Sequence, residues 1–415
     1  MKTGNFIKAV SAIILLVGAI SAQVRPVGGL TTMSFNKAGF DQSLQNAVGP
    51  NVIGYQYVLI KNGQVVSEKA GGVAQNAADG TLAMTTSTPT NIGSVAKFLS
   101  GTAMIGLMEK SAGPFVWDPG ATLQQKLNRK FFTIVPSVWK TGAKAGVENI
   151  TIRQLLQHRS GFDDAKANNR NVLGFLKDAD GFQQSQFDQR EYSNINFVLN
   201  GYLLPMYATS SFKDNLNNLV SQQNLNQTDG DAYVRQMAGT AMHNLMKSRI
   251  WDKMTPKIAP NCDGTSLSNT AAFGYTSKND SAQGAISSIM DSQGHCGGHG
   301  GYFMSSRALA AYLAHFSASD LIVTSAGRNA MYNESMNPND RLVWSSSTPN
   351  NWLGAKFKMP NVIWSNGIAG GYRSVILRLP QNYYLVLLTN SPDLSVSQLQ
   401  AAGVNAFIAG MQHNF

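Results

Sequence analysis

The sequence has 415 residues, of which 43% are hydrophobic and 13% are charged, and its formal net charge is +10 at pH 7. This length and composition exclude a disordered or fibrous chain and predict a globular protein with more than one core. The positive charge fits a surface that meets anionic cell-envelope material, but no Lys/Arg run with interleaved aromatic residues indicates a nucleic-acid partner.

The N-terminus has the pattern of a secretory signal peptide, which we place at residues 1–22. Lys2 and Lys8 precede an uncharged apolar stretch over 9–22 that is too short to span a bilayer. No later stretch is apolar enough to cross a membrane, so we expect a secreted or periplasmic protein with no transmembrane span. The rest divides into a first sheet part, a mostly helical domain and a second sheet part, over residues 23–103, 104–274 and 275–415.

Both ends of the mature chain carry strand patterns. A helix is expected over 34–48, followed by strands at 52–60 and 64–71 that flank Asn62-Gly63, a strong hairpin signal. Near the C-terminus, three more strand-like runs and a closing helix follow, at residues 361–367, 373–379, 383–390 and 396–411. We therefore predict an α/β (α+β) fold, with an antiparallel sheet of five or more strands, flanking helices and an inserted mostly helical domain.

Ser94 lies where an extended segment ends and a helix begins. A helical apolar pattern starts directly after it, and Lys97 follows one turn later on the same face. This places a nucleophile beside a base at the positive end of a helix. The Ser-x-x-Lys spacing recurs at Ser34, Ser137 and Ser210, but these lack the extended lead-in and the long apolar helix.

Three later stretches predict helices with recognisable starts or ends. A short helix over 150–162 ends in a glycine, and a helix over 195–204 is capped by Ser193 or Asn194. A glycine-rich turn passes into a third helix within 297–313, capped by Ser305 or Ser306.

These motifs carry a resemblance. The run Leu155-Leu156-Gln157-His158-Arg159-Ser160-Gly161, with Tyr192-Ser193-Asn194 and the Ser94/Lys97 pair, resembles the serine β-lactamase and penicillin-binding-protein superfamily. The likeness is to its class C-like branch, which holds class C β-lactamases, D-Ala-D-Ala carboxypeptidases and β-lactamase-like esterases. The resemblance also implies the fold predicted above.

The resemblance implies a role for each matching residue. Ser94 is the implied nucleophile, Lys97 and Tyr192 share its proton, and Asn194 orients the substrate or Lys97. Either Lys97 or Tyr192 can be the general base, and a Lys97 ammonium is expected to lower the pKa of Tyr192. His158 is interpreted as a packing residue.

The third motif of the superfamily, Lys-Thr-Gly or His-x-Gly, is altered here. A literal Lys140-Thr141-Gly142 precedes Tyr192 and has loop character, so we reject it. The equivalent is Ser365-Asn366-Gly367, whose expected role is to bind substrate and which lacks the basic residue that holds a substrate carboxylate in the relatives. The expected oxyanion donors are the backbone N–H groups of Ser94 and Ile368.

The two cysteines, Cys262 and Cys296, are expected to pair because the protein is expected to be exported. His295, Cys296 and His299 are alternatives as metal ligands, but no fourth ligand stands at a useful spacing. We therefore expect neither a metal nor another cofactor.

Three functional hypotheses remain. The first is an exported serine hydrolase that cleaves an ester or amide through an acyl-enzyme, with a small-molecule or peptide-like acyl substrate. The second is a β-lactamase or D-Ala-D-Ala peptidase that acts on peptidoglycan-related substrates. The third is a non-catalytic relative that binds envelope material or a partner.

Overall fold

The computed structural model describes residues 35–110, 120–165, 172–178, 180–286, 296–333, 341–346 and 362–411. The predicted signal peptide, Ser34 and His295 lie outside these residues. Within the described ranges, no helix is both long and apolar enough to cross a membrane.

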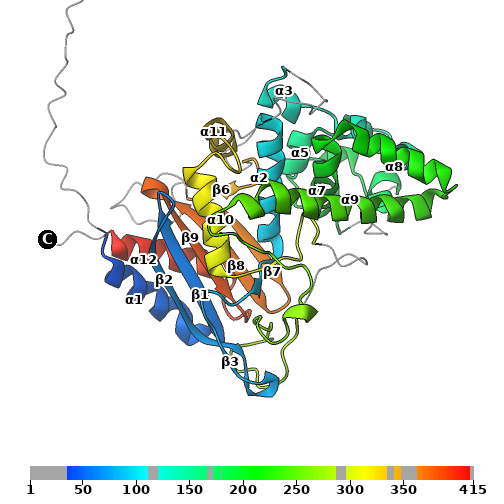
Figure 1. Cartoon of the computed structure of the whole chain (residues 1–415). Coiled ribbons are helices and arrows are strands. Elements are labelled where there is room, and N and C mark those ends of the chain that lie inside the picture. The colour runs from blue at the N-terminus through cyan, green and yellow to red at the C-terminus, as the bar shows by residue number, and fades with distance from the viewer. Residues whose placement is uncertain are drawn as a thin grey trace, which may run out of the picture.

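The described strands form a sheet in the order β3-β2-β1-β9-β8-β7-β6, so both ends of the chain contribute to it (Figure 1). Every pairing is antiparallel, which confirms the predicted sheet class. A separate short pair joins β4 (Thr90–Asn91) to β5 (Phe303–Met304). The sheet strands are β1 (Gly54–Lys61), β2 (Gln64–Gln75), β3 (Leu82–Ala83), β6 (Ser345–Ser346), β7 (Ile363–Ala369), β8 (Tyr372–Leu379) and β9 (Tyr383–Thr389).

The predicted hairpin is present between β1 and β2. Asn62 and Gly63 both have positive φ values, 49° and 79°, as a tight turn between right-handed twisted strands requires. Gly63 is needed there because a Cβ would lie 2.9 Å from the Ala318 side chain.

Helices cover both faces of the sheet. On one face, α1 (Lys37–Val48) and α12 (Val396–Gly410) pack on alternate residues of β8 and β9. On the other face lie α2 (Ala96–Glu109) and α10 (Ser306–Ala318). Strand β9 is buried along its whole length, which explains its continuous apolar run without alternation.

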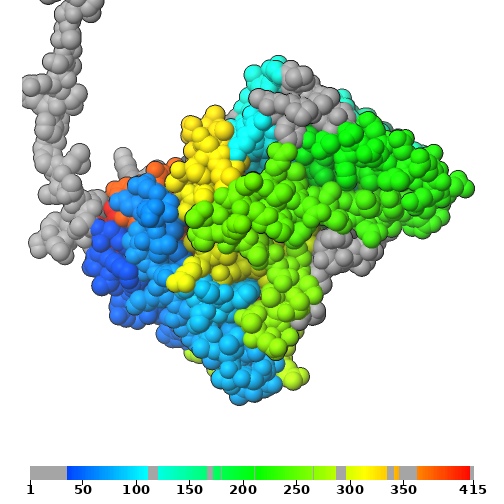
Figure 2. Space-filling view, in the orientation of Figure 1, coloured from blue at the N-terminus to red at the C-terminus, as the bar shows by residue number. Residues whose placement is uncertain are grey.

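A mostly helical region continues from α2 on one side of the sheet, with α7 at its centre in contact with α2, α5 and α9 (Figure 1). Figure 2 shows α8 and α9 as a green lobe on the right, away from the blue N-terminal strands. The domain limits at 103/104 and 274/275 stay predictions. The helices are α3 (Leu123–Leu127), α4 (Ser137–Lys140), α5 (Ile152–Leu156), α6 (Val172–Lys177), α7 (Ile195–Ala208), α8 (Ser210–Gln222), α9 (Gln227–Arg249) and α11 (Ser325–Asn333).

Helix α8 corrects our interpretation of Ser210 as lacking an apolar helix behind it. Phe212, Leu216 and Val220 recur every four residues and pack against the main core. This narrow apolar stripe is enough to hold α8 on the protein. Ser137 likewise begins the one-turn helix α4, after which the expected loop follows.

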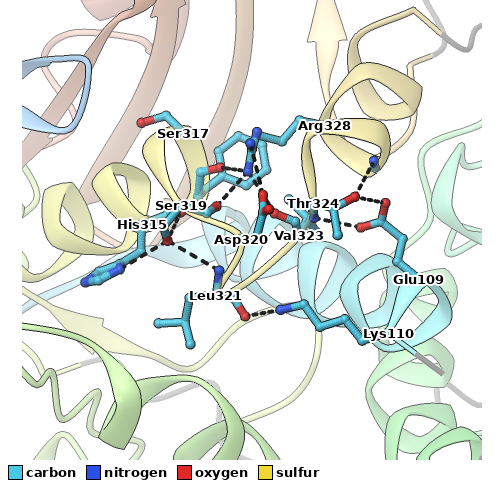
Figure 3. Close-up of polar contacts among 12 residues, drawn as sticks. Glu109, Lys110, His315, Ser317, Ser319, Asp320, Leu321, Val323, Thr324 and Arg328 are labelled. Atoms are coloured by element: carbon cyan, nitrogen blue, oxygen red, sulfur yellow. Dashed lines mark hydrogen bonds and ion pairs between the residues drawn. The ribbon is translucent and has the colours of Figure 1, made fainter. Parts of the chain in front are cut away.

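The C-terminal end of α2 is fixed to the segment between α10 and α11 (Figure 3). The Glu109 carboxylate accepts a hydrogen bond from the Thr324 backbone N–H at 2.9 Å, and the Lys110 ammonium donates to the Leu321 carbonyl. Arg328 donates to the carbonyls of Ser319 and Val323 in the same segment and to that of Phe316 in α10. These contacts anchor the helix whose opposite end carries Ser94.

Candidate active site

Ser94 lies in a 3-10 turn, Gly93–Val95, that leads into α2. The lead-in through Thr90 and Asn91 is extended, as the sequence predicts, and the structure shows that it pairs with β5. Gly93 has φ +49°, and a Cβ there would lie 2.7 Å from the backbone nitrogen of Ile368. A glycine is therefore required for β7 to approach the serine this closely.

Lys97 is 4% exposed, and its ammonium has three oxygen partners. Its Nζ donates to Ser94 Oγ at 2.8 Å, to Asn194 Oδ1 at 2.8 Å and to the His299 carbonyl at 3.2 Å. Burial lowers the pKa of Lys97 to about 7, although the nearby Asp164 carboxylate opposes this shift. Near neutral pH, a large fraction of Lys97 is therefore an uncharged amine that can accept the Ser94 proton.

Tyr192 approaches Ser94 from the segment before α7. Its Oη lies 2.8 Å from Ser94 Oγ, and its ring stacks on His158 with centroids 4.6 Å apart. Burial raises the pKa of the Tyr192 hydroxyl, and the hydrogen bond with Ser94 offsets only part of this. The expectation of a lowered Tyr192 pKa is therefore wrong, because the effect of burial outweighs the interactions that favour the tyrosinate.

Asn194 is held by a residue that the sequence did not single out. The Asp164 carboxylate accepts hydrogen bonds at 2.8 Å from both the backbone N–H and the side-chain amide of Asn194. The Ser193 hydroxyl donates to its other oxygen. Asp164 thus turns the Asn194 amide so that its oxygen faces Lys97. Although Asn194 precedes α7, its side chain makes no capping bond there.

His158 packs beneath the site, which agrees with its interpretation as a packing residue. Helix α5 ends at Leu156, before the glycine expected to end it, and His158 has a left-handed φ of 56°. Its Nδ1 accepts the Ser193 backbone N–H at 3.2 Å. Burial, with the charge of Lys97, lowers the pKa of His158 well below its ordinary value, so the ring is neutral.

The altered third motif lies on β7, beside the serine turn. A Cβ on Gly367 would lie 2.1 Å from the Ile92 carbonyl and 2.8 Å from the Ser94 nitrogen. The backbone nitrogens of Ser94 and Ile368 thus border one narrow gap that needs glycine on both sides. This arrangement can supply two N–H donors to a developing oxyanion.

A cleft of about 50 Å³ opens at Ser94. Its described lining contains Arg190 and Arg341, which the sequence analysis did not identify, and no Asp or Glu. A larger cavity of about 490 Å³ between α2 and α9 contains no nucleophile beside a base. The cleft lining is Ser94, Lys97, Leu156, Gln157, His158, Arg190, Tyr192, Phe197, Arg341, Val343, Trp344, Trp364, Ser365 and Asn366.

Cys262 and Cys296 form a disulfide with their Cα atoms 5.0 Å apart, so Cys296 is not a free thiolate ligand. Burial, with the charge of Lys97, lowers the pKa of His299 to about 4. Among the described residues, no group of three or more His, Cys, Asp or Glu side chains could hold a metal ion.

An antiparallel sheet with an inserted helical region, and a serine between a buried lysine and a tyrosine, together define the class of serine β-lactamases and penicillin-binding-protein-like folds. The chain belongs to the beta-lactamase family, which it matches over residues 40–409. No curated protein sequence matches it.

Solved structures share the fold at low sequence identity. A beta-lactamase from Sulfitobacter sp. EE-36 is 16% identical with a TM-score of 0.61, over 89% of this chain and 96% of the other. The D-alanine carboxypeptidase AmpC from Burkholderia cenocepacia is 14% identical with a TM-score of 0.59, over 90% and 99%. The D-amino acid amidase from Ochrobactrum anthropi SV3 is 17% identical with a TM-score of 0.58, over 89% and 98%.

Proposed function

We propose that this protein is an exported serine hydrolase that cleaves an ester or amide through an acyl-enzyme. The observation that carries the proposal is the position of Ser94 Oγ, 2.8 Å from both Lys97 Nζ and Tyr192 Oη. Membership of a hydrolase family supports it, and the apolar stretch over 9–22 supports export to the periplasm or the exterior.

In the acylation step, neutral Lys97 takes the proton of Ser94 as Oγ attacks the substrate carbonyl carbon. The N–H groups of Ser94 and Ile368 donate to the oxyanion. Tyr192, protonated because its pKa is raised, gives its proton to the leaving group as the carbon–heteroatom bond breaks. Lys97 then gives its proton to the Tyr192 oxygen, which lies on the other side of the same Oγ, so both groups are restored before deacylation.

In the deacylation step, a water attacks the acyl carbon and gives its proton to Lys97. The bond between carbon and Oγ breaks, and Ser94 regains a proton from Lys97, so the site returns to its starting state. Asn194, fixed by Asp164, keeps the Lys97 nitrogen aimed at Oγ through both steps.

A β-lactamase or D-Ala-D-Ala peptidase is the second candidate, because solved structures with those names share the fold. Ser365 favours the first candidate, since this position lacks the cation that such enzymes carry there. The polar contacts around Ser94 favour a catalyst over a purely binding protein, in which a buried lysine beside a serine would have no use.

The test compares hydrolysis of a short-chain 4-nitrophenyl ester and a chromogenic cephalosporin by the purified protein. We expect ester turnover, an initial burst of nitrophenolate and an acyl adduct on Ser94 by mass spectrometry. Ser94→Ala should lower the rate by at least about 10³-fold. The matched control is Ser137→Ala, which removes an exposed serine with the same Ser-x-x-Lys spacing.

Wild-type rates in Ser94→Ala would contradict the assignment of the nucleophile. Cephalosporin cleavage that exceeds ester cleavage would favour the second candidate. Silence of the wild-type protein on both substrates, and on a D-alanyl peptide, would favour the non-catalytic hypothesis.

A further inference from the structure

Three buried N–H donors without an acceptor gather around Tyr332, and two of them belong to residues that line the catalytic cleft. They are Arg341 Nε, Trp344 Nε1 and Arg378 Nε, and none has a hydrogen-bond partner in the described structure. Arg341 and Trp344 line the same cleft as Ser94. Buried donors are almost always paired in folded proteins, so a group of three that all lack an acceptor calls for one that the described residues do not supply.

The three side chains belong to one cluster around Tyr332. The Arg378 guanidinium lies over the Tyr332 ring at 4.0 Å from its centroid, and the Trp344 ring lies 6.5 Å from the same ring. Burial lowers the pKa of Arg341, and repulsion from the Arg378 guanidinium lowers it further. No carboxylate of the described residues forms a salt bridge with either arginine.

The segment that carries Arg341 is anchored against the helix of the nucleophile. The Val343 backbone N–H donates to the Leu156 carbonyl at 3.1 Å, and Val343 has a φ of +69°, which a β-branched residue rarely adopts. A Cβ on Gly101 would lie 2.5 Å from the Val343 side chain. Gly101 lies one turn after Lys97 on α2, so this packing fixes Arg341 relative to the catalytic residues.

We propose that Arg341, with Arg378 and Trp344, forms an anion subsite that binds a carboxylate or phosphate carried by the substrate. The proposal rests on the proposed function of Ser94, and it narrows the substrate class to esters or amides that bear an anionic group. A guanidinium fork can bind such a group with two parallel hydrogen bonds, and Trp344 Nε1 can supply a third.

This subsite changes what the missing cation at Ser365 means. The altered third motif alone implies weak recognition of anionic substrates. Arg341 comes from a different segment, before β6, and supplies a positive charge to the same cleft from another direction. Selectivity for anionic substrates is thus retained, with a different geometry.

The first experiment compares mono-4-nitrophenyl adipate with 4-nitrophenyl hexanoate, which differ by a terminal carboxylate on chains of equal length. A second pair, 4-acetoxybenzoate and 4-acetoxybenzamide, carries the difference on the leaving group. For at least one pair we expect kcat/KM to favour the anionic member in the wild type. The kcat/KM of the anionic member divided by that of the neutral member should fall about 10- to 100-fold in Arg341→Gln, and less in Arg341→Lys.

The control is Arg307→Gln, which removes an equal charge from a surface pair with Glu68 and should keep the wild-type ratio. Higher salt should reduce the preference in the wild type, because it screens the attraction. An equal preference in wild type and Arg341→Gln for both pairs would overturn the proposal.

The second experiment measures binding without turnover. Calorimetric titration of the Ser94→Ala protein with adipate, and separately with inorganic phosphate, should show binding that Arg341→Gln abolishes. The anion that binds more tightly identifies carboxylate or phosphate as the preferred group. Arg341-dependent binding without turnover in the wild type would sink the proposed function and leave the subsite standing. Ser94-dependent turnover with no binding of either anion would do the reverse.

Discussion

The two ends of the catalytic cleft differ in how completely their polar groups are paired. At the Lys97 end, three oxygens surround the lysine nitrogen, and Asp164 accepts from Ser193 and Asn194. At the Arg341 end, three buried N–H donors have no acceptor in the described structure. A complete network holds reacting groups in place before substrate arrives, whereas an incomplete one gains its missing partner only when a ligand binds.

The comparison separates residues that carry out the reaction from residues that select the substrate. Changes at the Lys97 end should lower turnover of every substrate, because they alter the nucleophile or its proton transfers. Changes at the Arg341 end should alter the ranking of substrates. The next three predictions probe the paired end, in order of decreasing effect.

Lys97→Met should cause the largest loss at the paired end. The variant keeps an unbranched side chain in the buried site but removes the base, so kcat/KM for a 4-nitrophenyl ester should fall by about 10²- to 10⁴-fold. The matched control is Lys126→Met, which removes another buried lysine whose Nζ donates to the Met108 carbonyl, away from the cleft. A Lys97→Met protein with more than about a tenth of the wild-type activity would refute the base assignment.

Tyr192→Phe should show a loss that depends on the leaving group. The ring can keep its stacking on His158, but the leaving group loses its proton donor. An amide needs that proton, so we expect about a 10²-fold loss or more on an amide, and at most about tenfold on a nitrophenyl ester. Tyr275→Phe, remote from the cleft and bound to Asp79, is the control. Equal losses on both substrates would rule out Tyr192 as the acid.

The sequence predicts the parts of this site that have local patterns. Apolar runs identify β7, β8 and β9, and the switch from an extended lead-in to a helical period marks Ser94 and Lys97. Family motifs indicate Tyr192 and Asn194, which the fold brings to Ser94 from about a hundred residues away.

The parts that the sequence does not predict depend on tertiary contacts. Asp164 stands 30 residues before Asn194 and beside another aspartate, so no spacing distinguishes it. The pKa direction of Tyr192 follows from burial, which composition around the residue does not reveal. Arg341 is one arginine among many until the fold places it in the cleft without a partner.

Asp164→Asn should have the smallest effect on rate and a distinctive effect on pH dependence. In the wild type, kcat/KM should fall below about pH 7, because protonation of Lys97 removes the base. The Asp164 charge raises the pKa of Lys97 against the lowering by burial. Neutralising Asp164 leaves burial unopposed, so the pKa of Lys97 drops and the acid limb moves to lower pH. The weaker base should lower the plateau by about tenfold.

The neighbouring Asp163→Asn provides the matched control, since the Asp163 carboxylate accepts the Ala165 backbone N–H, whereas the Asp164 carboxylate holds Asn194. In this control variant the acid limb of the kcat/KM profile should stay near pH 7. A limb that moves upward in Asp164→Asn would show that Lys97 is not the group that titrates. A lower plateau with an unmoved limb would assign Asp164 to the orientation of Asn194 alone. A limb above pH 10 in the wild type would instead make Tyr192 the base, because burial raises its pKa from the ordinary value of 10.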